Sequence, residues 1–426
     1  MSNKRFNSKK EHPANTLYIG IDIAKKKHCA RCLNSADSRQ SKPIFFNNRR
    51  EGFEKITSQV DSWLLQFNCK ELMIGMEPTA SYWNPLFYHL KNRNYDVKLV
   101  SSLKVKRSKD LRDNSPLKSD EKDALLISDL LKAGNYIDLR CEGNEKEVRK
   151  LLKAADDLDK TIGVYRNHVE HFLSKHFPEF EDVFDDLSTK TSRQVLREYP
   201  FPADIVNAGL KKIEKLIKTA SHGRMSADKA KLLLKSASSS IGLPQEDETD
   251  RDVILSKIEM LEAAYFELNK FEKSLEQKVR IHPMYEILDS VKFVGIKVIA
   301  SIIAYLGDLK KYDNSRQVLK MAGLNLYRFS SGSYRSRDRI SRRGSALLRK
   351  YLFMSALGNC REGSIYYEKY ISLISRGVPK KKAIVAIMRK MLRLLYALVR
   401  DNRKYESDYM PSRAKSDVIV IKRAAA

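Results

Sequence analysis

Short apolar segments of strand length alternate with longer segments of helical length along the first 140 residues, and this alternation constrains the fold more than any other feature. Five apolar segments are predicted strands: residues 17–23, 28–33, 43–47, 72–76 and 97–100. Residues 51–67 have apolar residues at helical spacing, and residues 82–92 and 121–133 are the other two predicted helices. The first three strands follow one another directly, which predicts an antiparallel meander. The resulting order is β-β-β-α-β-α-β-α.

This order is that of the RNase H-like fold. It predicts an α/β, RuvC-like domain over residues 16–141, preceded by a basic arm at residues 1–15. The active site of that fold lies on the first strand, at the end of the fourth strand and on a late helix. Acidic residues stand at all three places, namely Asp22, Glu77 and the pair Asp120 and Asp123.

The four acids are therefore candidate catalytic residues and metal ligands. Asp120 and Asp123 are three residues apart, so both can lie on one face of a helix. Converging carboxylates suit Mg²⁺ or Mn²⁺, because these hard ions prefer oxygen ligands. The alternative is that each acid is a solvated surface residue or a helix cap, a role that also suits Ser119. With the strand order included, the metal site is the favoured interpretation.

Residues 142–282 form a charge-rich middle region. Segments 142–182 and 250–280 carry apolar stripes at helical spacing, which predicts two long helices, paired as an antiparallel coiled coil. Residues 183–249 between them are expected to be a helical insertion. We expect this region to be a spacer or a dimer arm, and hence the protein to be a homo-oligomer, either a dimer or a tetramer.

Residues 283–404 are predicted to form a mainly α C-terminal domain, followed by a tail at residues 405–426. A turn at Gly295 leads into a buried helix, as in helix–hairpin–helix elements that contact phosphates. Helices are also expected at residues 346–357 and 380–399. Between apolar helices lies a polar, cationic segment, residues 327–345, which we interpret as a loop and which contains Ser330, Ser331 and Gly332.

That segment has the residue types needed to attack or to bind a phosphodiester. Ser331 is a candidate nucleophile, with guanidinium groups nearby to neutralise the phosphate. Equally, the hydroxyl groups there can simply donate hydrogen bonds to phosphate. The residues expected to bind nucleic acid are Lys25, Arg335, Arg337, Arg339, Arg342, Arg343 and Arg349.

The charge of the chain supports a polyanionic partner. The net charge is +27, divided as +10 over residues 1–141, −3 over residues 142–279 and +20 over residues 280–426. Excess Lys and Arg on both ends is typical of proteins that bind nucleic acid.

The five cysteines do not suggest a disulfide framework. Cys29 and Cys32 lie in a predicted strand without a second ligand pair at zinc spacing, so we expect buried or free thiols. The chain lacks a run of 18 apolar residues, so no membrane span and a cytoplasmic location are expected.

The motifs of the two ends resemble one known family. Tyr18-Ile-Gly-Ile-Asp22-Ile-Ala-Lys, Gly75-Met-Glu77-Pro-Thr-Ala and Lys118-Ser-Asp120-Glu-Lys-Asp123-Ala resemble the DEDD domain of insertion sequence 110 family transposases. These are relatives of the Piv invertase and include bridge-RNA-guided recombinases. Residues 295–308, Met321-Ala-Gly-Leu-Asn, Ser331-Gly332 and 339–349 resemble the C-terminal domain of that family.

The resemblance implies a transposase that excises a circular element and inserts it at a short target, guided by a structured RNA. Its partners would be DNA, at the element ends and the target, and the guide RNA. Asp22, Glu77, Asp120 and Asp123 would bind the metal, and Ser331 would form the covalent bond to the DNA phosphate. In the family, the tetrad of one protomer is thought to complete the serine site of another.

The chain departs from the family pattern at Val294, where a proline is usual, and at Ser333, where many relatives have a second glycine. Because Ser330 adjoins Ser331, the choice between these two nucleophiles stays open. One alternative function is a structure-specific endonuclease of Holliday junctions that hydrolyses DNA with two metal ions. A further alternative is a nucleic-acid-binding protein without catalytic activity, against which the intact tetrad counts.

Overall fold

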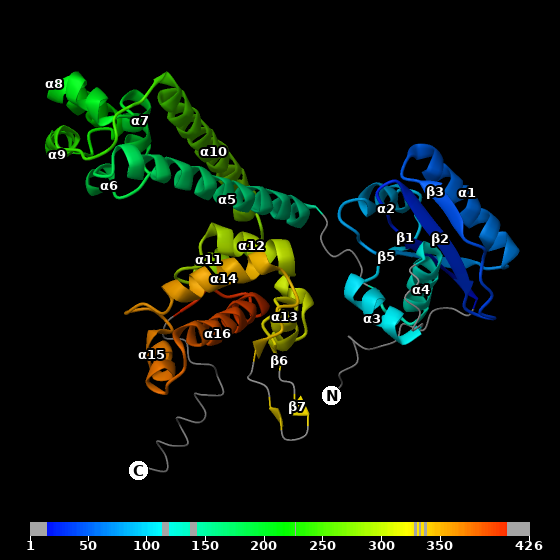
Figure 1. Ribbon diagram of the computed structural model, residues 1–426. Helices are drawn as coiled ribbons and strands as arrows, with labels where there is room; N and C mark the ends of the chain where they lie inside the picture. The colour runs from blue at the N-terminus through cyan, green and yellow to red at the C-terminus, as the bar shows by residue number, and fades with distance from the viewer. Residues whose placement is uncertain are drawn as a thin grey trace, which may run out of the picture. The chain divides into compact units, whose positions relative to one another are not determined.

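The computed structural model describes residues 15–112, 119–136, 143–225, 227–327, 330–331, 334–335 and 339–406. The chain divides into two compact units, residues 1–140 and residues 141–426, each described here by itself (Figure 1). Among the described residues, every helix is too short or too polar to cross a membrane.

The first unit is built on a five-stranded sheet. Its strands are β1 (Thr16–Asp22), β2 (Lys27–Asn34), β3 (Ile44–Asn47), β4 (Glu71–Met76) and β5 (Val97–Leu99). They lie in the order β3-β2-β1-β4-β5. The first three strands pair antiparallel, whereas β4 pairs parallel with β1 and β5 pairs parallel with β4. The predicted meander is thus confirmed, and the mixed sheet is consistent with an RNase H-like start of the chain.

Helices cover both faces of this sheet, because successive side chains of a strand point to opposite faces. Leu17, Ile19 and Ile21 pack with α1 (Arg50–Gln66) and α2 (Trp83–Lys91). Tyr18 and Met73 point the other way and pack with α3 (Ser102–Arg112) and α4 (Asp120–Lys132). Helix α3 was not predicted, since its sequence is rich in Lys and Arg and lacks an apolar stripe.

Two glycines allow α4 to lie directly against the sheet. A β-carbon at Gly20 would come within 2.0 Å of the Ala124 carbonyl oxygen and 2.6 Å of the Ser128 amide nitrogen. Gly75, the partner of Gly20 in the β1–β4 ladder, faces the Leu131 side chain in the same way. Any larger residue at Gly20 would push the backbone of α4 away from β1.

The second unit begins with two long helices, α5 (Asn144–His176) and α10 (Glu248–Arg280). They are antiparallel, as predicted: Asn144 donates a hydrogen bond to the Lys278 carbonyl, and at the far end His176 contacts the Leu243 carbonyl. Helix α5 ends before the predicted residue 182 because Pro178 disfavours helical geometry in the preceding residue. Four shorter helices fill the insertion: α6 (Phe180–Val183), α7 (Lys190–Glu198), α8 (Pro202–Ala220) and α9 (Ala227–Ser238).

The body of the second unit is a cluster of helices around α12 (Ile296–Leu306), which is almost entirely buried. The others are α11 (Tyr285–Asp289), the 3₁₀ turn η1 (Leu309–Lys311), α13 (Ser315–Met321), α14 (Ala346–Gly358), α15 (Tyr367–Ser375) and α16 (Lys380–Arg400). The turn at Gly295 shares a small pocket with Glu272 and Glu276 of α10. Lys297 lines the same pocket and pairs with Glu272 at 2.6 Å, so the charges around this turn are mixed.

The cationic segment between α13 and α14 forms paired strands where the sequence suggested a loop. Strand β6 (Leu326–Tyr327) pairs with β9 (Arg339–Ile340), and β7 (Ser330–Ser331) pairs with β8 (Tyr334–Arg335). Both pairs are antiparallel, and β7 extends away from the helical body of this unit (Figure 1). The segment therefore folds back on itself as a hairpin.

Candidate active site and nucleic-acid interface

The alternation of the strands directs the first two predicted acids to one face of the sheet. Asp22 is two residues after Gly20, and Glu77 is two residues after Gly75, so both acids share the face on which α4 packs. Helix α4 begins at Asp120, and Asp123 follows one turn later with its residue only 7% exposed. Ser119 occupies the N-cap position without a capping hydrogen bond from its side chain.

The carboxyl group of Asp22 is affected by the charges of the other three acids. The pKa of Asp22 is raised to about 6, first by burial and then by the negative charges of Asp123, Asp120 and Glu77. Lys109 of α3 opposes this effect, and its Nζ atom lies 2.5 Å from Oδ2 of Asp123. Glu77, Asp120 and Asp123 therefore lie near enough to Asp22 to raise its pKa, and Lys109, which sequence reasoning missed, lies beside Asp123.

These residues fit a divalent metal in their chemistry. Four carboxylates supply hard oxygen donors, and mutual repulsion among them is relieved by a bound cation. Within the described part of the chain, however, no three His, Cys, Asp or Glu side chains are arranged closely enough to hold an ion. Asp123 is instead neutralised by Lys109.

One cysteine of the CxxC motif, Cys29, lies beside the acids, whereas Cys32 packs in the core on the other face of the sheet. Cys29 pairs with Asp22 in the β1–β2 ladder. Burial raises the pKa of Cys29 to about 12 and that of Cys32 to about 11, so both are protonated thiols at neutral pH. Both are free and buried among the described residues, as the sequence predicted.

The predicted nucleophile is in the second unit. Ser331 ends β7, where it pairs with Tyr334, and Ser330 pairs with Arg335. Gly332, Ser333 and Arg337 lie outside the described residues. Lys25, in the first unit, is exposed in the turn after Asp22.

The remaining predicted cations, Arg339, Arg342, Arg343 and Arg349, line one groove of about 1270 Å³. We call it the hairpin groove, because β6 and β9 form one side and α14 and α16 form the others. Gly323 and Gly344 bring its backbone segments into contact: a β-carbon at Gly344 would come within 2.3 Å of the Met321 carbonyl oxygen. The sequence did not indicate that α16 contributes Lys381, Lys382 and Arg389 to the same groove.

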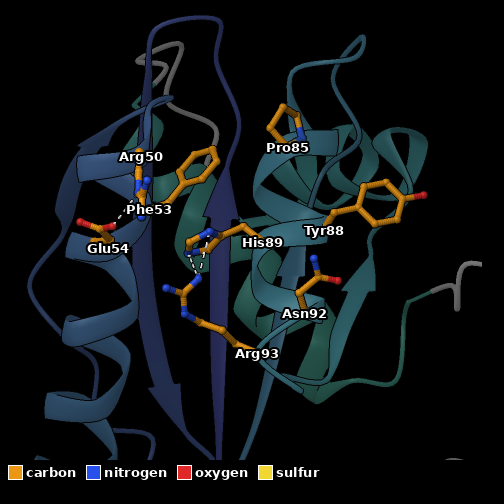
Figure 2. Close-up of a pocket in the computed structure, with 8 residues that line it drawn as sticks. All are labelled: Arg50, Phe53, Glu54, Pro85, Tyr88, His89, Asn92 and Arg93. Atoms are coloured by element: carbon orange, nitrogen blue, oxygen red, sulfur yellow. Dashed lines mark hydrogen bonds and ion pairs between the residues drawn. The ribbon is translucent and has the colours of Figure 1, made fainter.

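A second, smaller pocket of about 520 Å³ lies between α1 and α2 (Figure 2). His89 packs on Phe53 with ring centroids 5.2 Å apart, and Nη1 of Arg93 lies 2.6 Å from its Nε2. Arg50 pairs with Glu54 at the rim. The residues that line this pocket, as far as the chain is described, include none of the predicted site residues, and the pocket is on the face of the sheet opposite α4.

Comparisons with known proteins agree at both ends of the chain. A family model for DEDD transposases of IS110 elements, described as a transposase, matches residues 19–178. A second model, described as the transposase IS116/IS110/IS902 family, matches residues 285–368. The first match includes all four acids, and the second includes the hairpin with Ser331.

Full-length relatives give the same picture. An insertion element IS110 protein of 43.6 kDa from Streptomyces coelicolor is 22% identical over 398 residues, which are 92% of this chain and 96% of the relative. The pilin gene-inverting protein of Moraxella bovis is 22% identical over 396 residues, covering 91% of this chain and 97% of the relative. Since both family models match in order and the relatives align along almost their whole length, the chain belongs to the IS110 family of transposases, enzymes that recombine DNA.

Proposed function

We propose that this transposase cuts and rejoins DNA through a covalent bond between Ser331 and a DNA phosphate, assisted by a divalent metal ion at Asp22, Glu77, Asp120 and Asp123. The observation that carries the proposal is the raised pKa of Asp22, which results from burial beside three further carboxylates. Such a concentration of negative charge is unfavourable unless a cation binds. An acid that was merely solvated, or that merely capped a helix, would not be buried beside three other carboxylates.

Attack by Ser331 exchanges one phosphodiester bond for another, so the DNA can be rejoined without a further source of energy. The Oγ atom gives up its proton and bonds to phosphorus, while the bond from phosphorus to one deoxyribose oxygen breaks and that oxygen takes up a proton. A hydroxyl group of another strand end then reverses the exchange and rejoins the DNA. Arginines of the hairpin groove support this role, because guanidinium groups neutralise the charge that develops on the phosphate.

The metal ion is Mg²⁺ or Mn²⁺ in this proposal, held by the four carboxylates. When bound, it would supply positive charge that polarises a phosphate oxygen. Lys109 would then release Asp123 or remain as a second cation beside it. The exposed position of Asp120 at the start of α4 suits a ligand that shares its metal with a DNA phosphate.

We include two partners in this proposal, a structured guide RNA and further copies of the chain. The RNA is supported by the presence of two separate cationic regions, +10 over residues 1–141 and +20 over residues 280–426, which offer one surface for RNA and one for DNA. The oligomer is supported by exposed apolar side chains on α10. Val253 is 52% exposed, Met260 44% and Phe266 69%, and burial of such residues stabilises helix pairs.

Single substitutions of the two serines test the mechanism. Purified protein is incubated with circular DNA that carries the sequences flanking its gene, and denaturing gels detect protein bound covalently to DNA. We expect Ser331→Ala to abolish both the adduct and the joined product, and Ser330→Ala to retain both. Loss of the adduct with Ser330→Ala alone would transfer the role to Ser330. Normal joining by both variants would refute a serine nucleophile, whereas cleavage with neither adduct nor joined product in the unmodified chain would favour metal-dependent hydrolysis.

A further inference from the structure

The lining of the hairpin groove combines cationic side chains, which we call its rim, with large apolar side chains, which we call its floor. As far as the chain is described, its lining contains Lys and Arg but neither Asp nor Glu. Between these cations lie large apolar side chains that are open to solvent: Tyr327 is 54% exposed, Leu326 52% and Met354 58%. Exposed apolar groups in this number cost free energy in water, so the groove has the character of a binding site.

The cations of the groove lack internal compensation. Lys350 pairs with Asp156 of α5, at 2.6 Å, from outside the groove. Burial lowers the pKa of Arg349, and the positive charge of Arg342 lowers it further. The buried Nε of Arg389 has no hydrogen-bond partner among the described residues. A partly buried guanidinium with an unused donor favours an anionic ligand.

The apolar floor determines which anion fits. A DNA duplex presents sugars and phosphates to a groove and keeps the faces of its bases stacked inside, so it would leave Tyr327 and Met354 uncovered. An unpaired strand presents phosphates and the faces of its bases together, and bases stack on aromatic side chains. The rim then contacts phosphates while the floor covers bases. Both halves of the groove are complemented only by unpaired nucleotides.

Continuity of the chain indicates which strand this is. Strands β6 and β9 form one side of the groove, and the same hairpin continues into β7, which carries Ser331. We propose that the hairpin groove binds an unpaired stretch of the DNA strand undergoing cleavage and holds it open beside the serine. Only the origin of this strand rests on the proposed function, because the groove's preference for unpaired nucleotides follows from its own lining.

Binding of short labelled oligonucleotides to the full chain tests this inference. Fluorescence polarisation compares a single-stranded oligothymidine with a duplex of the same length. We expect Tyr327→Ala to weaken single-strand binding by about 5- to 100-fold, the value of one stacked base, while duplex binding is unchanged. Tyr327→Phe should restore it. Ile371→Ala removes an apolar side chain, 44% exposed on α15 outside the groove, and should change neither affinity.

The rim gives an independent measurement. Lys382→Ala removes a phosphate contact without altering the floor, so it should weaken binding of both DNA forms and reduce the salt dependence by about one charge. Photo-cross-linking of 5-iodouracil oligonucleotides, followed by mass spectrometry, should identify the peptide that contains Tyr327. This last measurement needs no substitution and therefore does not depend on the folding of a variant.

Three results would overturn the inference. The first two are that Tyr327→Ala weakens the binding of duplex and single strand equally, or that it weakens neither. The third is that cross-links are confined to peptides without Tyr327. Tighter, Tyr327-dependent binding of oligouridine would refute a DNA strand as the occupant. The Ser331→Ala variant separates this inference from the proposed function, because it should form no adduct yet bind the single strand as the unmodified chain does.

Discussion

The carboxyl group of Asp22 shows how one residue reports on its surroundings. Its raised pKa reflects burial and three neighbouring acids from a second strand end and a helix. A residue that merely ended a strand would remain solvated and would keep its ordinary pKa. The residue type was evident in the sequence, but the raised pKa required the approach of α4, which carries Asp120 and Asp123.

The first prediction concerns Asp123, the most buried of the four acids. Asp123→Asn removes a charge while keeping the shape of the side chain, so we expect recombination to fall by about a hundredfold or more with nucleic-acid binding retained. Divalent ions should raise the unfolding temperature of the unmodified chain more than that of the variant, because ligand binding stabilises the folded state.

The matched control for this prediction is Glu51→Gln, which likewise replaces a carboxylate by an amide. Glu51 is an exposed residue of α1, on the opposite face of the sheet. It should leave recombination and the metal-induced stabilisation unchanged. Full recombination by Asp123→Asn in Mg²⁺ would remove Asp123 from the metal site.

The second prediction concerns His28, which is fully buried on β2. Burial lowers its pKa below the ordinary 6.5, so the neutral ring is favoured in the folded chain. As the pH falls below 6.5, the unfolded chain takes up a proton at this site that the folded chain resists, and stability is lost. This loss is at most about 1.4 kcal/mol per pH unit for one group.

Urea unfolding between pH 7 and pH 5 measures the effect. Both tryptophans of the chain, Trp63 and Trp83, are in the first unit, so their fluorescence follows its unfolding in the intact protein. We expect His28→Phe, which preserves the edge contact with Phe46, to show a shallower loss of stability on acidification. Identical slopes for both proteins would mean that His28 does not couple folding to pH in this range.

At the scale of elements, the position of α4 depends on the absence of a side chain at Gly20. Alanine there would place its β-carbon 2.0 Å from a backbone oxygen, and a helix backbone yields less readily than a side chain. We expect Gly20→Ala to destabilise the first unit by about 3 kcal/mol or more and to abolish recombination. Gly75→Ala should cost less, about 1–2 kcal/mol, because the Leu131 side chain can shift.

Gly163→Ala is the matched control for both glycines. This residue is in the middle of α5, where a β-carbon would meet no described atom within 4 Å. Alanine should therefore leave the tryptophan-detected unfolding of the first unit unchanged. In the second unit it should stabilise α5 by about 1 kcal/mol. A Gly20→Ala variant as stable as this control would mean that α4 does not pack closely on β1.

Comparison of particular elements shows which parts of the fold could be predicted. The strands and α4 have strong periodicity, and the predicted segments agree with β1 to β5 within a few residues. Helix α3 was missed because only tertiary packing of Val105 reveals its buried side. The hairpin was interpreted as a loop, since Ser, Gly and Arg carry little strand signal and its pairing joins residues such as Leu326 and Ile340.

At the scale of the whole molecule, acids of the middle region form ion pairs with particular lysines of the C-terminal region and neutralise part of its positive charge. Asp156 of α5 pairs with Lys350, and Asp159 of α5 and Glu272 of α10 both pair with Lys297. The long helices thus neutralise Lys297 and one groove cation, Lys350, whereas the other cations of the hairpin groove have no acidic residue in the described lining. Positive potential is therefore concentrated at the groove rather than spread evenly.

The last prediction concerns the guide RNA. We expect sequencing of RNA that co-purifies with the full chain to show one structured species, transcribed from the DNA beside its gene, enriched over cellular RNA. Ser331→Ala should enrich the same species, because RNA binding does not use the serine hydroxyl. RNA recovered merely in proportion to its abundance in the cell would contradict guidance by a specific RNA, while loss of binding at high salt is expected of any nucleic acid.

The sequence by itself determined the strand order, the family motifs and the placement of acids at strand ends, because a period of two or of 3.6 residues is set by local geometry. The tertiary structure alone decided that Gly20 admits α4, that Lys109 neutralises Asp123, and that the hairpin joins α14 and α16 in one groove. These features depend on contacts between segments far apart in the chain, and such contacts arise only when whole elements pack against one another.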